Sequence, residues 1–97
     1  MKQHQYRINV QYLSDHEGQP VNQDITFEAP NHDNLFNIIA MTEQREGFTP
    51  EMAQRFVVGL KLLGEVMLEN RDNPLFRQLR PHFMEMMKVI KGKNKTE

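Results

Sequence analysis

The sequence predicts a small α+β domain in which an N-terminal antiparallel β-hairpin is followed by three or four α-helices, in the order ββααα. Two patterns predict this fold: apolar residues alternate with polar residues before Pro30 and recur at helical spacing after it. The third observation is length, because 97 residues without an internal repeat or linker fit one domain. We therefore expect a single domain over 1–97, with the hairpin at 4–29, a helical part at 31–91 and a frayed, charged tail at 92–97.

The hairpin is predicted from two segments with a period of two. The apolar residues of matching parity are Tyr6, Ile8, Val10 and Tyr12 in the first segment and Val21, Ile25, Phe27 and Ala29 in the second. Between them, residues 14–20 are rich in turn-forming residues, and Pro30 ends the second strand. An isolated hairpin is only marginally stable in water, so we expect its apolar face to pack on the helices. Its free edges remain available to another strand.

The first helix is expected to begin just after Pro30. Asn31 is the candidate N-cap and Asp33 the alternative, because a short polar side chain accepts hydrogen bonds from the first backbone N–H groups. Apolar residues and a threonine follow at helical spacing, namely Leu35, Ile38, Ile39 and Thr42. Gly47 is the predicted stop, since glycine adopts the positive φ of a helix C-terminus without steric cost.

The second helix is predicted to start at Thr49-Pro50, a hydroxyl cap followed by proline at the first helical position. The following stretch is apolar except for Lys61 and Glu65, which are expected to pair on its exposed side, so this is the predicted central, most buried helix. Gly59 and Gly64 each cost about 1 kcal/mol of helix propensity relative to alanine. Close approach of another backbone would explain them, and a kink or a ligand contact is the alternative.

The last helical segment is predicted to open at Asn73-Pro74, again a cap followed by a first-position proline. Pro81 either restarts or kinks it, which is why the sequence allows three or four helices. Gly92 is the expected end of the helical part.

Five segments of the chain together resemble one protein family. They are Gly59–Leu68 (GLKLLGEVML), Asn73–Phe76 (NPLF), Leu79–Phe83 (LRPHF), His4–Ile8 (HQYRI) and His32–Phe36 (HDNLF). The chain resembles a family of small uncharacterised bacterial proteins known as domain of unknown function 3861. This resemblance covers nearly the whole chain and implies a bacterial, cytoplasmic, standalone protein. It implies no activity and no functional residues.

The residue pattern does not indicate catalysis or a bound cofactor. Cysteine is absent, which excludes a thiolate nucleophile, a disulfide and a cysteine-ligated metal site. The four histidines come from four different segments, and none has the spacing of a zinc motif. The acidic residues of the first third fall in the hairpin loop or on its polar face, where a desolvated acid–base pair is not expected. We predict no catalytic, cofactor-binding or metal-binding residues and no enzymatic activity.

The expected cellular location is inferred from sequence features that the chain lacks. No apolar run approaches the roughly 20 residues that span a bilayer. Residues 1–5 have no apolar core of a secretory signal, and the absence of cysteine fits a reducing compartment. We expect a cytoplasmic protein without a membrane partner.

The last quarter of the chain is basic, which makes nucleic-acid binding a possible function to consider. A nucleic-acid binder normally shows a strong, clustered positive excess, whereas the isoelectric point here is about 6.4. Phe76 and Phe83 also fit core positions better than base-stacking positions. The sequence therefore argues against a nucleic-acid partner.

Protein interaction is the favoured function, as a regulatory accessory module that forms a homodimer or binds another, unidentified protein. The candidate interaction surface consists of Met84, Met86, Met87, Arg77 and Arg80. Methionine is flexible and common on surfaces that repack against partners, although plain core filling explains the same cluster. Residues 1–48 carry three basic and seven acidic side chains (net −4), and residues 49–97 carry nine and six (net +3). Such halves attract each other within one chain or between two.

The alternative function is small-ligand binding in a pocket between the hairpin and the helices. The residues expected to line that pocket are Tyr6, Tyr12, Phe27 and Phe56. A ligand pocket is typically apolar, with a few polar groups that orient the ligand. Two tyrosines and two phenylalanines fit that composition.

Overall fold

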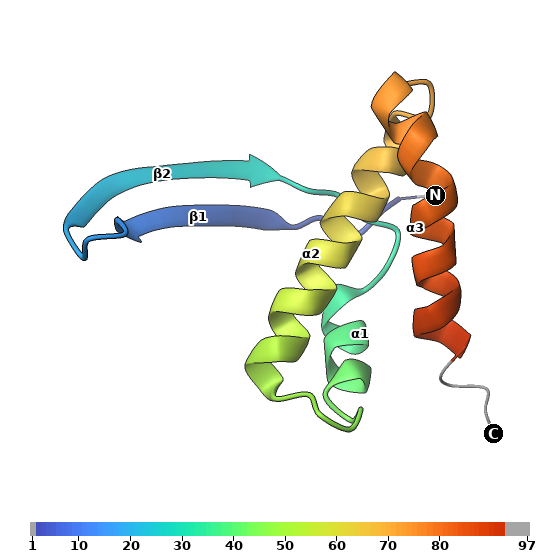
Figure 1. Cartoon of the computed structure of the whole chain (residues 1–97), viewed down its shortest axis with the longest axis horizontal. Coiled ribbons are helices and arrows are strands. Elements are labelled where there is room, and N and C mark those ends of the chain that lie inside the picture. Colours follow the sequence, from blue (N-terminus) through green and yellow to red (C-terminus); the bar gives the residue numbers. More distant parts are fainter. Residues whose placement is uncertain (1, 93–97) are drawn as a thin grey trace. The chain divides into compact units, whose positions relative to one another are not determined.

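The computed structural model describes residues 2–92 and shows a two-stranded antiparallel sheet followed by three helices (Figure 1). The elements are β1 (Arg7–Ser14), β2 (Pro20–Glu28), α1 (Leu35–Thr42), α2 (Pro50–Glu69) and α3 (Pro74–Gly92). This order confirms the predicted α+β class. The charged tail expected at 92–97 lies outside the described residues, except for Gly92 at the end of α3.

The chain divides into two units, Met1–Leu62 and Leu63–Glu97, with the boundary inside α2. The first unit contains the hairpin, α1 and the first thirteen residues of α2. The second contains the end of α2 and α3. The assignment of one domain to 1–97 stays a prediction.

The hairpin forms where the period of two predicts it. Val10 lies opposite Ile25, and Ile8 lies opposite Phe27, so the apolar residues of both strands share one face. The loop is closed by Asp15, whose Oδ1 accepts hydrogen bonds from two backbone N–H groups of the turn at 2.9 Å each. In Figure 1 this hairpin extends well beyond α1 as a two-stranded arm.

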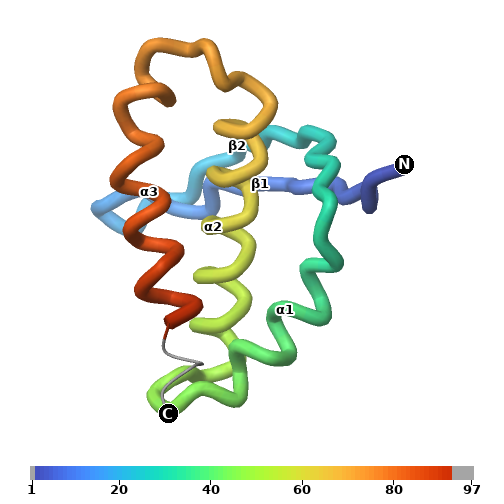
Figure 2. Tube along the Cα trace, turned by 90° about the vertical axis from the view of Figure 1, so that its right-hand side faces the viewer, coloured from blue at the N-terminus to red at the C-terminus, as the bar shows by residue number. Residues whose placement is uncertain are grey.

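Strand pairing continues past the base of the hairpin. His4 and Asn31 form an isolated antiparallel bridge, and the Ala29 N–H donates to the Tyr6 carbonyl at 2.9 Å. Figure 2 shows the two segments side by side as the chain turns toward α1. The arm therefore joins the rest of its unit through a hydrogen-bonded stem.

The first helix starts later than predicted. Its N-cap is Asn34, whose side chain accepts hydrogen bonds from the Phe36 and Asn37 N–H groups. The prediction of Asn31, or alternatively Asp33, as the N-cap was wrong. Both side chains instead bond to Lys61 of α2 at the stem of the arm. The helix ends at Thr42 with Glu43 as its C-cap, so Gly47 was wrong as the stop, although it has the expected positive φ, 87°, in the following loop.

The core of the first unit lies where α1 runs beside the start of α2 (Figures 1 and 2). Leu35 of α1 and Ala53 and Val57 of α2 are all buried. The predicted Thr49-Pro50 start is confirmed, since the Thr49 hydroxyl accepts a hydrogen bond from the Met52 N–H. Ala53 has no exposed surface at all, which fits a small residue where two helices approach closely.

In the second unit the predicted Asn73-Pro74 start is confirmed, because Asn73 Oδ1 accepts from the Leu75 N–H at 2.9 Å. Pro81 neither restarts nor divides the helix, so the described residues form three helices and not four. A proline lacks only one backbone donor, and an exposed helix tolerates that loss when water reaches the freed carbonyl.

Three further expectations about packing need correction. The apolar face of the hairpin is exposed at Val10 and Tyr12 instead of being packed on helices. Glu65 is buried, with 7% of its surface exposed, and is not part of a solvated helix face. Lys61 bonds to Asp33 Oδ2 at 2.8 Å across the fold. Helical spacing did not predict the burial of Glu65 or the bond between Lys61 and Asp33, because both depend on residues far away in the sequence.

Candidate interaction surfaces

One face of the hairpin is apolar and exposed to solvent. Its central pair, Val10 and Ile25, is exposed to 52% and 62%, and Phe27 and Tyr12 are also exposed. Ile8, nearest the stem, is half-buried. A shallow depression of about 270 Å³ lies on the arm and is lined by Val10, Tyr12, Gln23, Asp24 and Ile25. A contiguous apolar surface of this kind is typical of a protein contact site.

The opposite face of the hairpin is polar and satisfied by its own side chains. Asn9 Nδ2 donates to Asp24 Oδ2 and to Thr26 Oγ1, both at 2.9 Å. Arg7 Nε donates to Glu28 Oε2 at 2.9 Å. The two faces therefore differ in chemistry. Covering the apolar face with another surface removes apolar area from water, and this stabilises the resulting contact.

A cluster of polar side chains fixes the stem of the arm. The Tyr6 hydroxyl donates to the Asp33 carbonyl and accepts from the Leu35 N–H, both at 2.9 Å. Lys61 Nζ donates to Asp33 Oδ2, and Asn31 Nδ2 donates to the Lys61 carbonyl at 3.2 Å. Among residues 2–92, no buried side-chain nitrogen or oxygen lacks a partner. The hydrogen bonds of this cluster connect the arm to α1 through Leu35 and to α2 through Lys61.

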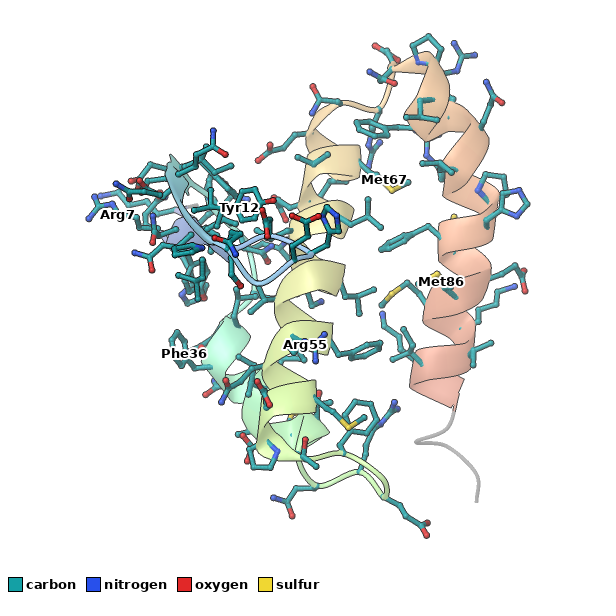
Figure 3. All side chains as sticks on the ribbon, turned by 60° about the vertical axis from the view of Figure 1, so that its left-hand side comes forward. Arg7, Tyr12, Phe36, Arg55, Met67 and Met86 are labelled. Atoms are coloured by element: carbon teal, nitrogen blue, oxygen red, sulfur yellow. The ribbon has the colours of Figure 1, made fainter. Side chains whose placement is uncertain are left out.

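The second unit carries a groove of about 320 Å³ between the end of α2 and α3. It is lined by Gly64, Met67, Leu68, Arg71, Arg80, Phe83 and Met84. Met67 is buried and points from α2 toward α3 in Figure 3, so it forms the floor. Arg71 and Arg80 are exposed, and Arg80 Nη2 donates to the Arg71 carbonyl at 2.9 Å. An apolar floor beside two guanidinium groups suits an apolar group that carries carboxylates. We call this the arginine groove.

Comparison with known proteins gives the family but no activity. A family model described as a domain of unknown function with a solved structure, DUF3861, matches residues 4–92. The chain belongs to the DUF3861 family. It is similar to a protein of unknown function from Pectobacterium atrosepticum SCRI1043, whose crystal structure was solved at 2.20 Å resolution. The two share 34% sequence identity with a TM-score of 0.79, over 93% of this chain and 98% of that one. No match was found among curated proteins.

The predicted interaction residues of this DUF3861 chain are only partly brought together. Arg80 and Met84 both line the arginine groove. Met86 is exposed and Met87 half-buried, and Arg77 is exposed, but none of the three lines that groove. Sequence reasoning missed four lining residues, namely Met67, Leu68, Arg71 and Phe83. The sequence feature that indicated this groove was Gly64, a glycine inside a predicted helix.

The four residues expected to line a ligand pocket lie in different environments. Tyr6 is part of the stem, Tyr12 lines the depression on the arm, and Phe27 is exposed on the same apolar face. Phe56 packs edge-to-face on Phe48, with ring centres 5.6 Å apart. A separate surface hollow contains Phe48, Met52, Arg55 and Phe56. The arginine groove contains none of the four predicted residues, and the depression on the arm and this hollow contain one each.

Two further features concern metals and membranes. Within residues 2–92, no group of three or more histidine, aspartate or glutamate side chains has a geometry that would hold a metal ion. In the same part of the chain, no helix combines the length and apolar character needed to cross a membrane.

Proposed function

We propose that this DUF3861 protein is a non-catalytic interaction module that forms a homodimer through its hairpin arm and acts as an accessory to another protein. The observation that carries the proposal is the exposed apolar face of the arm, centred on Val10 and Ile25. The absence of cysteine supports a cytoplasmic site of action, and the similar protein from a bacterium supports a bacterial origin.

The physical argument starts from the stability of the arm. Two strands alone are marginal in water, and three or more strands or a covering surface are needed for independent stability. Here the strands of eight and nine residues expose apolar side chains on one face and unpaired backbone groups on both edges. A second copy supplies the same face, so an isologous contact covers both arms at once.

The chemistry of the arm favours association over catalysis. Its polar face is bonded internally through Asn9 and Arg7, and its stem is bonded through Tyr6. These groups already have partners, so the part of the arm with most to gain from a contact is apolar. Burying apolar area contributes about 25 cal/mol per Å², and the gain depends on area rather than on reactive groups.

The direct test is mass in solution. Light scattering over a concentration series is expected to give about twice the chain mass of 11.5 kDa. The double variant Val10→Thr/Ile25→Thr keeps β propensity but removes the apolar pair, and it is expected to raise the dimer dissociation constant at least about tenfold.

The matched control changes a cross-strand pair on the polar face, Arg7 and Glu28, neither of which lines the depression. Arg7→Thr/Glu28→Thr keeps β propensity and net charge and is expected to dimerise as the wild type does. Far-UV circular dichroism of all three proteins shows whether the fold is retained. A wild-type monomer that carries a reproducible added mass in native mass spectrometry would contradict the proposal in favour of a ligand-binding function.

A further inference from the structure

We propose that the tip of the hairpin arm of one copy docks in the arginine groove of a second copy. In this contact Leu13 covers the apolar floor, and the carboxylates of Asp15 and Glu17 lie beside Arg71 and Arg80. The inference rests on the proposed homodimer and specifies which surfaces the two copies exchange.

The groove defines the chemistry of its occupant. Its floor is apolar at Met67, and its edge carries two exposed arginines. One N–H group of Arg80 is used by the Arg71 carbonyl, which holds the guanidinium in place. A guanidinium has five N–H donors in a planar fork, so donors remain for a carboxylate. The occupant must therefore present an apolar side chain close to acidic groups.

The tip of the arm has that composition. Leu13 is 72% exposed at the end of β1, and the loop that follows carries Asp15 and Glu17. Asp15 is fixed by two backbone N–H groups, and Glu17 is exposed. An apolar side chain and two carboxylates thus lie within five residues on a preformed turn.

Charge complementarity extends beyond the contact itself. The segment 8–44 contains no lysine or arginine, and its acidic residues include both carboxylates of the tip. The segment 71–91 carries five basic and two acidic residues, two of the five being the arginines of the groove. Opposite potentials on two surfaces steer their encounter and set its register.

The arm is long enough to reach a neighbour. Eight strand residues span roughly 26 Å at about 3.3 Å per residue, and Figure 1 shows the hairpin extending beyond α1. Each copy has one tip and one groove, so two copies related by a twofold axis make the contact twice. Such an exchange closes at a dimer and does not propagate.

A charge-exchange experiment tests the contact. The tip variant is Asp15→Asn/Glu17→Lys, in which asparagine retains the oxygen that accepts the turn hydrogen bonds. The groove variant is Arg71→Glu/Arg80→Glu. Alone, each places like charges at both contacts, and its dimer dissociation constant is expected to rise at least about tenfold. An equimolar mixture is expected to restore the dimer, because the mixed dimer then has one wild-type contact and one charge-exchanged contact, both between opposite charges.

The mixture also separates exchange from contact within one chain. If the tip met the groove of its own chain, mixing two variants would restore nothing, and the inference would be overturned. The control Lys88→Glu/Lys91→Glu makes the same change of charge on α3 outside the groove and is expected to dimerise as the wild type does.

A second measurement does not depend on charge reversal. The natural chain has no cysteine, so Leu13→Cys in one chain and Leu68→Cys in another create one possible disulfide between the two surfaces. Mild oxidation of the mixture is expected to give a covalent heterodimer. Leu13→Cys mixed with Phe36→Cys is the control, because Phe36 is equally exposed but lies on α1 and points away from α2 (Figure 3).

The outcomes distinguish this inference from the proposed function. Tip docking is overturned, while the hairpin dimer stands, if the groove variant leaves the dimer intact and the Leu13→Cys and Leu68→Cys chains form no disulfide with each other. A wild-type monomer overturns both. A small acidic ligand is the occupant if native mass spectrometry finds an added mass that the groove variant loses while its dimer persists, and that result also overturns tip docking.

Discussion

The ring of Phe83 lies 3.2 Å from the position that a Cβ atom would occupy at Gly64. The glycine in α2 thus lets an aromatic side chain of α3 approach the helix backbone closely. The sequence indicated a close approach here, but of another backbone rather than of a ring. At Gly59, five residues earlier, no atom of residues 2–92 outside the adjoining helix backbone lies within 4 Å of the corresponding Cβ position.

The two glycines are expected to respond differently to alanine. Gly59→Ala gains helix propensity at no steric cost and should raise the free energy of unfolding by about 0.5–1 kcal/mol. Gly64→Ala should gain less, because the Phe83 ring must shift by a few tenths of an ångström to admit the methyl group. Urea denaturation of the two variants measures the difference. Equal gains at both positions would show that Phe83 does not restrict Gly64.

Removing the Tyr6 hydroxyl should loosen the stem of the arm. Tyr6→Phe deletes one donated and one accepted hydrogen bond in a half-buried site, and it should lower the free energy of unfolding by about 1–2 kcal/mol. Tyr12→Phe is the matched control, since Tyr12 is 47% exposed on the arm, and no comparable loss is expected. Thermal unfolding followed by circular dichroism compares them, and similar melting temperatures would argue against an anchoring role for Tyr6.

Asparagine-to-aspartate exchange separates the true helix cap from the buried asparagine. Asn34→Asp keeps the accepting oxygen at the N-terminus of α1, so stability should change by less than about 0.5 kcal/mol. Asn31 is 3% exposed, and its Nδ2 donates to the Lys61 carbonyl. Asn31→Asp replaces that donor with a buried charge and should cost at least about 2 kcal/mol. Chemical denaturation tests this order, and a larger loss at Asn34 would contradict it.

The ion pair between Lys61 and Asp33 should matter more than the surface pair between Lys88 and Glu85. The side chains of the first pair are 22% and 31% exposed, whereas those of the second are 74% and 73% exposed. Lys61→Met should lower stability by about 1–2 kcal/mol, and Lys88→Met by less than about 0.5 kcal/mol. Differential scanning calorimetry at low and high salt measures both, and equal effects would show that burial does not strengthen the inner pair.

Local rules predicted the features that depend on neighbouring residues. The alternating apolar residues gave the paired faces of the hairpin, including Val10 opposite Ile25. The starts of α2 and α3 followed from Thr49 and Asn73, each directly before a proline. These predictions held because each hydrogen bond and each side-chain direction is set within a few residues of backbone geometry.

The same rules failed where distant groups compete for a residue. Asn31 has the chemistry of a cap, but its amide is used by the Lys61 carbonyl, thirty residues away. A proline such as Pro81 is typical of a helix boundary, yet α3 continues through it. The burial of Glu65 could not be inferred from helical spacing, since it depends on what surrounds that position in three dimensions.

The sequence by itself determined the α+β class, the order of hairpin and helices, the family and the absence of a recognisable catalytic motif. The class, the order and the lack of a motif follow from periodicity, caps and composition, whereas the family follows from the resemblance of five segments. Only the tertiary structure decided that the apolar face of the arm is exposed and that Arg71, Arg80 and Met67 meet in one groove. Exposure and convergence depend on which surfaces cover one another, and that is a property of packing between residues far apart in the sequence.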